Sequence, residues 1–327
     1  PVFMPQDKSF VQKVGVKKYG TNAKTTVSNG AFKIADWTGT NDTYKLVRNP
    51  YYWDKSAIKL DEIKYQTVKD SNTAHNLFEN GKLDDATISG VTAKSLQKNR
   101  NLKHVSKAWT YYLQVNQRQN QPLANHKLRQ AISLVINRPE LTSKVLADGS
   151  LPASSFVSPG TAVDPTTGKD FSKETSFSVQ PNVKKARSLW NEGKKEAGLK
   201  GSVGLSIVGD DQDVTKNVAQ YLQSQLNSKL PGVKVTIANI PDKAQQARRS
   251  EGKFDLAQWY WLADFGDPIN YLGILTTNNT MNPGKFSDST YDSLVQKAKS
   301  AGSQAAYWRY LRHAEKRLMS QHGIIPI

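Results

Sequence analysis

The alternation of strand and helix patterns over residues 203–262 constrains the fold of this chain more than any other feature. Apolar runs at 203–208, 233–240 and 254–262 predict three strands, and the segments between them carry helical apolar spacing or open with a proline. A strand, helix, strand, helix, strand order is a βαβαβ unit, which favours parallel or mixed strands in one sheet with helices packed on it. We therefore expect these three strands in a single sheet of an α/β domain.

Patterns elsewhere extend this α/β organisation. A turn at Asn29-Gly30, period-two alternation and a second turn at 39–42 predict a hairpin that Asn49-Pro50 ends. Further strands are expected at 58–68, 83–88, 109–116 and from 324 onward, and helices at 71–80 (capped by Ser71), 125–135, 139–148, 183–197, 213–226 (capped by Asp213), 291–300 and 303–321. We interpret the Pro- and Gly-rich stretch 150–180 as a surface or ligand-edge loop rather than a domain boundary, and the aromatic run 51–53 as a cluster packed over the sheet edge.

Composition excludes several classes of protein. The chain has 327 residues, enough for two lobes, and no run of about eighteen apolar residues predicts a membrane-spanning helix. The mean hydropathy of −0.60 indicates a soluble protein. The absence of cysteine excludes disulfides, thiol catalysis and cysteine-based metal sites. The stretch Pro1 to Pro5 has neither an initiator methionine nor the pattern of a signal segment, so we expect that segment to be absent or removed.

The chain is strongly basic, with a net charge of +17. The lysines are dispersed, and Lys17-Lys18, Lys184-Lys185 and Lys194-Lys195 are the densest pairs. Charge of this kind attracts phosphate but reads no sequence, and no nucleic-acid-binding motif accompanies it. We therefore expect no nucleic-acid partner, and interpret the charge as a solvated surface facing an anionic cell wall or membrane.

The sequence lacks the motifs of the common catalytic and metal sites. It has no Walker A, Gly-x-Gly-x-x-Gly, Gly-x-Ser-x-Gly or His-Glu-x-x-His pattern, and its five histidines are scattered. Residues 210–213 resemble half a calcium loop but lack the required glycine and glutamate, so they are better interpreted as a helix cap. We expect no cofactor and no metal. Asp264 and Asp267 fit the paired carboxylates of glycoside hydrolysis, which leaves a carbohydrate-active enzyme as the alternative to a binding protein.

The run from Trp261 to Pro268 is the strongest candidate for a site. Trp259, Tyr260 and Trp261 lie within a few residues of Asp264, at a Gly/Asp/Pro break after an apolar strand. An aromatic-walled site with one carboxylate suits a ligand that carries an amine and variable apolar bulk. The alternative is a buried strand that ends in an ordinary turn, with Asp264 as its cap.

Five blocks, in order along nearly the whole chain, carry a family resemblance. They are Asn-Gly-Ala-Phe-Lys-Ile at 29–34 with Leu-Val-Arg-Asn-Pro-Tyr-Tyr-Trp at 46–53, then 127–138, 149–153, 254–268 and 286–292. Together they resemble the extracellular peptide-binding proteins of ABC importers, the oligopeptide-binding type of solute-binding protein family 5.

The resemblance implies a periplasmic-binding-protein-like α/β fold of the large, peptide-binding class, with mixed sheets flanked by helices and two lobes. Residues 1–107 resemble only the return segment of the first lobe, and residues 108–327 resemble the second, far lobe, whose last residues begin the crossing back. The resemblance thus implies a fragment with an incomplete first lobe. We expect exposed apolar surface around 29–65 and near 324–327, and poor peptide binding or self-association.

The resemblance also assigns ligand-binding residues. Asp264 would pair with the α-ammonium of a peptide, Trp261 would wall the first side-chain pocket, and Arg249 would lie near the peptide carboxylate. Tyr111 and Asn116 lie on the strand that resembles the interlobe crossing and are expected to face the cleft. A second base expected on the strand at 254–262 is glutamine here, at position 258, which departs from the family pattern.

The function implied is capture of oligopeptides and their delivery to a membrane-embedded ABC permease, by a protein that is not an enzyme. Other cargoes within the family stay open, namely a peptide pheromone, a nickel chelate or an oligosaccharide. The resemblance further implies a Gram-positive cell-surface lipoprotein, anchored to the cytoplasmic membrane outside this chain and monomeric at full length.

Overall fold

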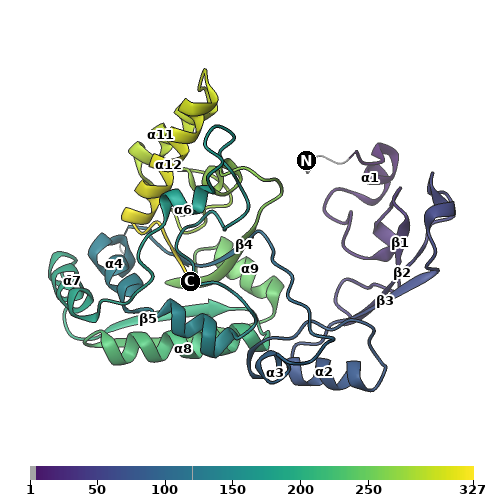
Figure 1. Ribbon diagram of the computed structural model, residues 1–327, viewed down its shortest axis with the longest axis horizontal. Helices are drawn as coiled ribbons and strands as arrows, with labels where there is room; N and C mark the ends of the chain where they lie inside the picture. The colour runs from purple at the N-terminus through teal and green to yellow at the C-terminus, as the bar shows by residue number, and fades with distance from the viewer. Residues whose placement is uncertain (1–4, 120) are drawn as a thin grey trace. The chain divides into compact units, whose positions relative to one another are not determined.

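The computed structural model describes residues 5–119 and 121–327, and the chain divides into two compact units, residues 1–74 and 75–327 (Figure 1). The first four residues of the expected first lobe, including most of the stretch Pro1 to Pro5, lie outside the described part. The boundary expected between residues 107 and 108 divides the lobes of a longer protein, and it stays a prediction.

The first unit is built on a three-stranded antiparallel sheet of order β1-β2-β3. The predicted hairpin is confirmed, because β1 and β2 pair from Phe32 opposite Arg48 to Ala35 opposite Lys45. Tyr44 and Tyr65 stack across β2 and β3 with their ring centroids 4.9 Å apart. The elements of this unit are α1 Lys8–Val14, a 3₁₀ turn Ala23–Thr25, β1 Phe32–Ala35, β2 Thr43–Arg48, a 3₁₀ turn Lys55–Ala57 and β3 Glu62–Gln66.

The aromatic run that follows β2 does not pack over the sheet edge, so that expectation is wrong. Tyr51 is 88% exposed and Trp53 is 85% exposed. The cause is the buried Asn49, whose side chain donates to the Gly30 carbonyl at 2.8 Å and accepts from the Tyr51 amide at 3.2 Å. These bonds turn the chain out of the sheet before the aromatic residues, so this part of the first unit has the exposed apolar surface that the sequence predicts.

The second unit contains a five-stranded mixed sheet of order β6-β5-β7-β4-β8. β5 pairs in parallel with both β6 and β7, while β4 is antiparallel to β7 and β8. The βαβαβ prediction for residues 203–262 is therefore confirmed, with all three strands in one sheet. The strands are β4 Trp109–Val115, β5 Val203–Gly209, β6 Val233–Asn239, β7 Leu256–Leu262 and β8 Ile324–Pro326.

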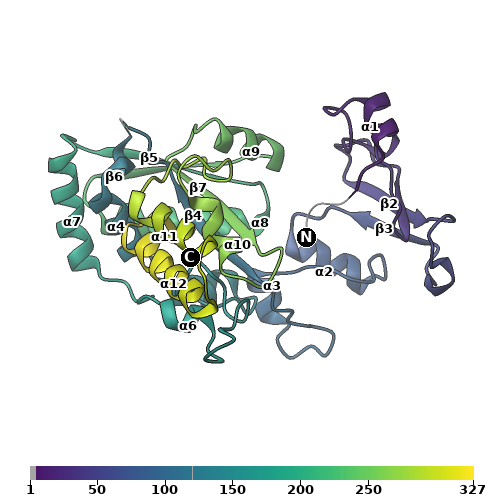
Figure 2. The same cartoon turned by 90° about the horizontal axis from the view of Figure 1, so that it is seen from above.

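Helices cover both faces of this sheet (Figures 1 and 2). One apolar cluster joins α4, α7 and α8 to strand residues such as Leu113, Ile207 and Leu256, and a second joins α10, α11 and α12 to Tyr112 and Ile324. Along β4 and β8 the two clusters take alternate residues, as the pleat requires. The helices from residue 71 onward, whether or not they pack on this sheet, are α2 Ser71–Glu79, α3 Gly90–Ser95, α4 His126–Val135, α5 Arg138–Glu140, the π-helix Leu141–Leu146, α6 Phe171–Thr175, α7 Val183–Glu196, α8 Asp213–Lys229, α9 Asp242–Ser250, α10 Ile269–Leu272, α11 Ser289–Lys299 and α12 Gln304–Ser320. Two 3₁₀ turns lie at Pro122–Ala124 and Gly273–Leu275.

Exposed apolar surface was expected near residues 324–327, and that expectation is wrong. β8 pairs with β4 from Gln114 opposite Ile324 to Tyr112 opposite Pro326. Ile324 is 2% exposed and Ile325 is 0% exposed, because one faces each apolar cluster. Pairing with β4 and packing against the two apolar clusters thus bury Ile324 and Ile325.

The stretch 150–180, interpreted as a surface or ligand-edge loop, has exposed residues such as Leu151 but is also partly buried, so a surface loop describes it only in part. Phe156, Val157 and Phe171 are fully buried in the second apolar cluster. Glu315 of α12 holds this segment through its Oε1, which accepts from the Phe156 amide at 2.5 Å. Because Phe156 and Phe171, the first residue of the short helix α6, are buried, the segment contributes to the core although its composition is that of a loop.

Three smaller expectations also need correction. Residues 83–88, all described, form no strand. The N-terminal cap of α2 is Asp70, whose carboxylate accepts from the Thr73 amide at 2.7 Å, rather than Ser71. α8 already includes Asp213 in its first turn and is preceded by Gln212.

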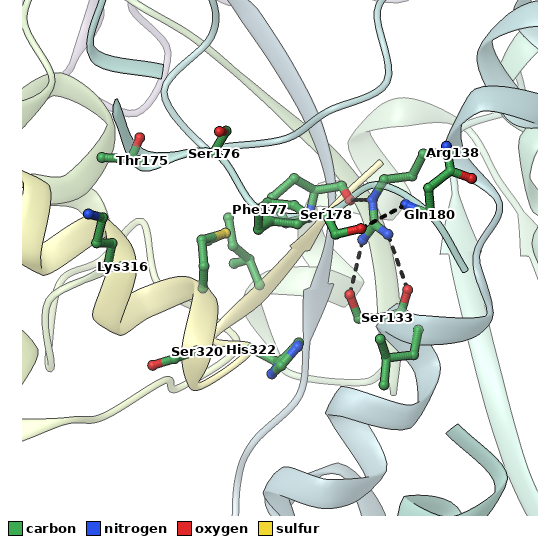
Figure 3. Close-up of a pocket in the computed structure, with 14 residues that line it drawn as sticks. Ser133, Arg138, Thr175, Ser176, Phe177, Ser178, Gln180, Lys316, Ser320 and His322 are labelled. Carbon is green, nitrogen blue, oxygen red and sulfur yellow. Dashed lines mark hydrogen bonds between the residues drawn. The ribbon is translucent and has the colours of Figure 1, made fainter. Parts of the chain in front are cut away.

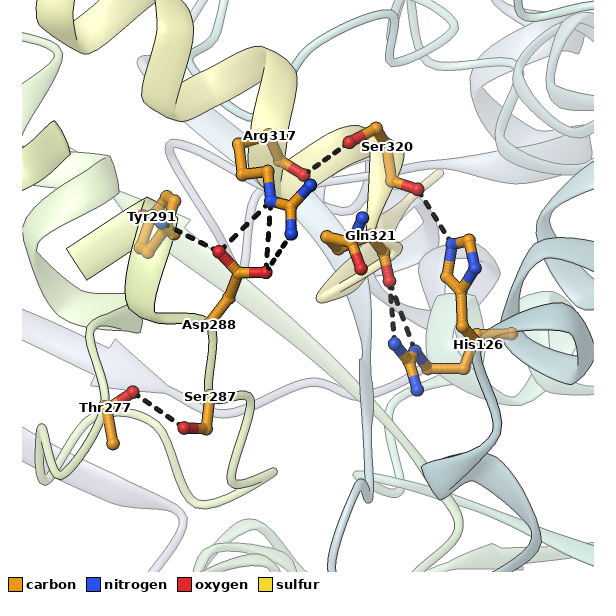
Figure 4. A network of polar contacts seen from close by, with 9 residues as sticks. His126, Thr277, Ser287, Asp288, Tyr291, Arg317, Ser320 and Gln321 are labelled. Carbon is orange, nitrogen blue, oxygen red and sulfur yellow. Dashed lines mark hydrogen bonds and ion pairs between the residues drawn. The ribbon is translucent and has the colours of Figure 1, made fainter. Parts of the chain in front are cut away.

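Polar contacts tie the last turn of α12 to its neighbours (Figure 4). Arg317 forms a salt bridge to Asp288 at 2.7 Å, before α11, while Arg129 of α4 donates to the Gln321 carbonyl at 2.9 Å. His126 contacts the Ser320 carbonyl at 2.8 Å. The bonds from Arg129 and His126 satisfy carbonyl groups that the helix end leaves without an internal partner.

Candidate functional site

The carboxyl ends of the parallel strands β5, β6 and β7 lie at one edge of the five-stranded sheet, where α/β proteins commonly bind ligands. Gly209 ends β5 there, and a Cβ at this position would lie 2.7 Å from both the Gln258 Nε2 and the Thr215 Cγ2. The Asn239 side chain at the end of β6 donates to the Asp210 carbonyl at 2.8 Å. This edge is therefore polar and tightly packed.

Next to this edge, β4 and β7 present an aromatic group on one face, which we call the aromatic shelf: Trp109, Tyr111 and Tyr260. Tyr111 lies opposite Tyr260 in the strand register, with their ring centroids 5.5 Å apart, and Trp109 stacks on Tyr260 at 5.1 Å. Tyr111 is 47% exposed and Tyr260 is 39% exposed. Burial, together with the nearby carboxylates of Asp210 and Asp148, raises the pKa of the Tyr111 hydroxyl. The shelf thus combines exposed ring faces with negative surroundings, which suits a cation.

Asp264 follows the last residues of β7 and is exposed. Its backbone amide donates to the Oδ1 of Asn270 at 3.2 Å. Within residues 5–119 and 121–327, no hydrogen bond or ion pair engages the Asp264 carboxylate. By contrast, Asp267 accepts from the Ile269 amide at 2.9 Å and from the Tyr307 hydroxyl at 2.6 Å. The turn cap is therefore Asp267, and the Asp264 carboxylate stays available to a ligand.

Trp261 lies close to Asp264 but on the other face of the sheet from the aromatic shelf. Its ring packs partly against the second apolar cluster, and its indole N–H donates to the same Asn270 Oδ1 at 2.8 Å. The pleat therefore separates Tyr260, on the shelf, from Trp261, on the opposite face, while the Trp259 ring stacks on Tyr260 with the ring centroids 5.6 Å apart.

Arg249 is buried, with 7% of its surface exposed, and its guanidinium lies 3.5 Å from the ring centroid of Trp259. It donates to the Gln114 side chain at 3.1 Å, and burial lowers its pKa. Gln114 and Trp259 both belong to the face opposite the aromatic shelf. The structure thus places Arg249 away from Tyr111, and its contact with a peptide carboxylate stays a prediction.

Asn116 lies at the far end of β7 from Asp264. It is 1% exposed, and its side-chain amide donates to the Phe254 carbonyl at 2.7 Å and to the Gly252 carbonyl at 3.1 Å. At about 3.3 Å per strand residue, on the order of 25 Å of strand separates the two positions. The structure brings Asp264 and Trp261 together and places Tyr111 on the shelf, but it does not bring Asn116 to them.

Sequence reasoning missed the residue that joins Asp264 to Trp261. Asn270 lies in α10, and no short motif marks an asparagine in the first turn after an Asp-Pro pair. Sequence reasoning also missed the grouping of Trp109 and Tyr260 with Tyr111, because only the observed register of β4 and β7 brings the three rings together. Among the described residues no group of three metal-binding side chains gathers, and no helix is long and apolar enough to cross a membrane.

A cavity of about 440 Å³ lies elsewhere in the second unit (Figure 3). It is bordered by the buried Arg138, which donates to the Ser133 carbonyl at 3.1 Å and to the Pro326 carbonyl at 2.7 Å, and by Phe177 and His322. None of the predicted site residues lines it. The candidate site is therefore the open strand edge with the shelf and Asp264, not this cavity.

Comparison with known proteins bears on this arrangement. The middle region of bacterial extracellular solute-binding proteins, family 5, matches residues 1–283. The chain belongs to this family. A dipeptide-binding protein of Lactococcus lactis is 35% identical over 311 residues, which cover 91% of this chain and 56% of that protein.

Two solved structures match this family 5 protein closely. The substrate-binding domain of an oligopeptide ABC transporter from Bacillus anthracis is 34% identical with a TM-score of 0.92, covering 98% of this chain and 63% of that chain. The peptide-binding pheromone receptor PrgZ is 34% identical with a TM-score of 0.92, covering 99% and 63%. The chain thus spans less than two thirds of the length of these three proteins.

Membership in this family tests several of the expectations drawn from the sequence. The predicted α/β fold of the peptide-binding type is confirmed, and the protein is a solute-binding protein rather than an enzyme. The carbohydrate-active alternative based on Asp264 and Asp267 is therefore set aside. The family is described as extracellular, and its relatives include peptide-binding proteins of ABC transporters.

Proposed function

We propose that this solute-binding protein captures short peptides through their free amino terminus and delivers them to a membrane-embedded ABC permease. The observation that carries the proposal is the exposed Asp264 carboxylate, which no described residue pairs, at the end of β7. Its relatives bind dipeptides, oligopeptides or pheromone peptides according to their names, and a free α-ammonium is a group that such ligands share.

The chemistry of the strand edge supports an amine-bearing ligand. A carboxylate paired with an ammonium in a partly desolvated site forms a strong charge-assisted hydrogen bond. The aromatic shelf and the charges of Asp148 and Asp210 beside Tyr111 add a negative potential that favours the same charge. We propose Asp264, Trp261 and Tyr111 as the ligand-binding residues, with Arg249 and Asn116 as more distant contributors that hold the sheet around the site.

The setting proposed for this activity is the outside of the cell. We propose a monomeric surface lipoprotein of a Gram-positive bacterium, with peptide and permease as partners and no nucleic acid. A peptide pheromone is the second candidate cargo, since the similarity to PrgZ favours it. A nickel chelate or an oligosaccharide lacks the ammonium that a free carboxylate at Asp264 would pair.

The test is Asp264→Asn in the protein at its full natural length, with calorimetry on free and N-acetylated pentapeptides. Breaking a desolvated charge pair costs about 2–4 kcal/mol, so free peptides should lose that much affinity. N-acetylated peptides lack the charge and should bind weakly to the unchanged protein and lose little more in the variant. Asp85→Asn removes one exposed carboxylate elsewhere and controls for net charge. Equal losses for free and acetylated peptides would contradict the proposal.

A further inference from the structure

A single side-chain oxygen holds both Trp261 and Asp264. The Oδ1 of Asn270 accepts from the Trp261 indole at 2.8 Å and from the Asp264 backbone amide at 3.2 Å. Two donors that converge on one atom require an acceptor there, so they fix which end of the Asn270 amide is the oxygen. Asn270 is 7% exposed, so these bonds form where water competes weakly.

The short helix α10, which carries Asn270, is itself anchored at both sides of this residue. Asp267 accepts from the Tyr307 hydroxyl of α12 at 2.6 Å. Tyr271 is fully buried, and its hydroxyl donates to the Ala108 carbonyl at 2.7 Å and lies 2.8 Å from the Ser158 hydroxyl. Asn270 is therefore an acceptor held in place by the core, not a side chain that adjusts to its surroundings.

The Ala108 carbonyl links this anchor back to the end of β7. It accepts from the Ala263 amide at 3.0 Å as well as from Tyr271. Asn270 thus bonds directly to Asp264, and the next residue, Tyr271, shares the Ala108 carbonyl as an acceptor with Ala263. The backbone of Asp264 is fixed while its carboxylate projects from an exposed residue without a partner among the described side chains.

We propose that Asn270 is a positioning residue that presents the Asp264 carboxylate and the Trp261 ring in one fixed arrangement, and so sets the preference for a free amino terminus. This inference rests on the proposed function of Asp264. A fixed carboxylate needs no reorganisation when an ammonium arrives, and preorganisation of this kind raises affinity by lowering the cost of ordering. Without Asn270, Trp261 can rotate and the segment after β7 can shift, so the ammonium contact weakens while contacts to the rest of a peptide remain.

The test measures discrimination rather than affinity alone. An equimolar library of free and N-acetylated random pentapeptides is applied to the full-length protein, and the ratio of the two bound forms is read by mass spectrometry. In Asn270→Ala this ratio should fall about tenfold, the equivalent of one lost hydrogen bond. Asn270→Asp keeps an acceptor for both donors and adds a negative charge that favours an ammonium, so it should keep or raise the ratio. If Asn270→Ala does not fold, Asn270→Ser replaces it, because its hydroxyl is too short to reach both donors.

Asn282 supplies the matched control. It is 2% exposed in the same unit and also makes backbone hydrogen bonds, donating to the Phe286 carbonyl at 2.8 Å and accepting from the Phe286 amide at 3.2 Å. Asn282→Ala should lower the unfolding temperature and leave the free-to-acetylated ratio unchanged. The inference is overturned if Asn270→Ala keeps the ratio within about twofold, or if Asn282→Ala lowers it equally. A protein that binds both forms equally before any substitution refutes the role of Asp264 itself, which is a different result.

Discussion

The buried Glu315 should make the stability of this protein depend on pH in a way that one substitution removes. Glu315 is 0% exposed, its Oε1 accepts from the Phe156 amide, and its Oε2 has no hydrogen-bond partner among the described residues. Burial raises the pKa of this carboxyl from 4.5 to about 7 in the folded protein. A raised folded-state pKa means that folding favours the protonated form, so the contribution is present below about pH 4.5 and is lost as the pH rises through about 7.

The size of the effect follows from the difference between the two pKa values. Each unit corresponds to about 1.4 kcal/mol, so the raised value amounts to about 3 kcal/mol of stability between the two limits. Glu315→Gln keeps an oxygen for the Phe156 amide and never ionises, but it puts an amide N–H₂ where Oε2 lacks a partner. That unpaired donor costs about 1–3 kcal/mol at every pH. The quantity that tests the prediction is therefore the difference in free energy of unfolding between Glu315→Gln and the unchanged protein, and how that difference varies with pH.

The assay is urea unfolding followed by tryptophan fluorescence at about pH 4.5, 6 and 8, with the free energy of unfolding extrapolated to water. From the lowest to the highest pH, Glu315→Gln should gain about 3 kcal/mol relative to the unchanged protein. Other titrating groups, His322 included, cancel in this difference. Glu251→Gln, which removes an exposed carboxylate at the end of α9, is the control and should show no such gain. A gain below about 1 kcal/mol would refute the idea that Glu315 is buried with a raised pKa.

Other predictions concern acid stability, the sheet edge and the α10 anchor. Burial lowers the pKa of His322 from 6.5 to about 3, so the stability contributed by its neutral form is present above about pH 6.5 and is lost as the pH falls through about 3. Asparagine does not titrate and tolerates the φ of 48° at this position. His322→Asn should therefore remove about 3 kcal/mol of the acid destabilisation measured by urea unfolding between about pH 6.5 and 4. Gly209→Ala should cost about 1–3 kcal/mol because its Cβ would collide at 2.7 Å, whereas Gly204→Ala in the same strand, with nothing within 4 Å, should cost less than about 1 kcal/mol; equal losses in denaturant unfolding would show that the edge can relax. Tyr307→Phe removes the 2.6 Å bond to Asp267 and should lower the free energy of unfolding by about 1–3 kcal/mol, and an unchanged value would show that α10 does not depend on this anchor.

The presence of three strands in one sheet was predictable from local pattern because the information is local, whereas the order of all five strands was not. The apolar runs at 203–208, 233–240 and 254–262 have strand length, the intervening segments have helix length, and parallel crossovers of that size are sterically restricted to one arrangement. The same holds for Asp264, which the sequence marks by its place at a break after an apolar strand. Turn chemistry and period are properties of neighbouring residues, so they need no knowledge of the rest of the chain.

Burial by distant residues was not readable. Composition marks 150–180 as a loop, yet Glu315 and the second apolar cluster bury Phe156 and Phe171, because the partners lie about 150 residues away in sequence. The short apolar run from Ile324 was expected to be exposed and instead pairs with β4.

The sequence by itself determined the α/β class, the three strands in one sheet and the carboxylate at the end of β7. The tertiary structure alone decided which side chains meet there. It placed Tyr260 beside Tyr111, buried Arg249 against Trp259 and brought the Asn270 side chain into contact with the Asp264 backbone. The physical reason is that periodicity fixes which residues share a face, whereas the register of strands far apart in the sequence and the packing of helices on them fix what each face contacts.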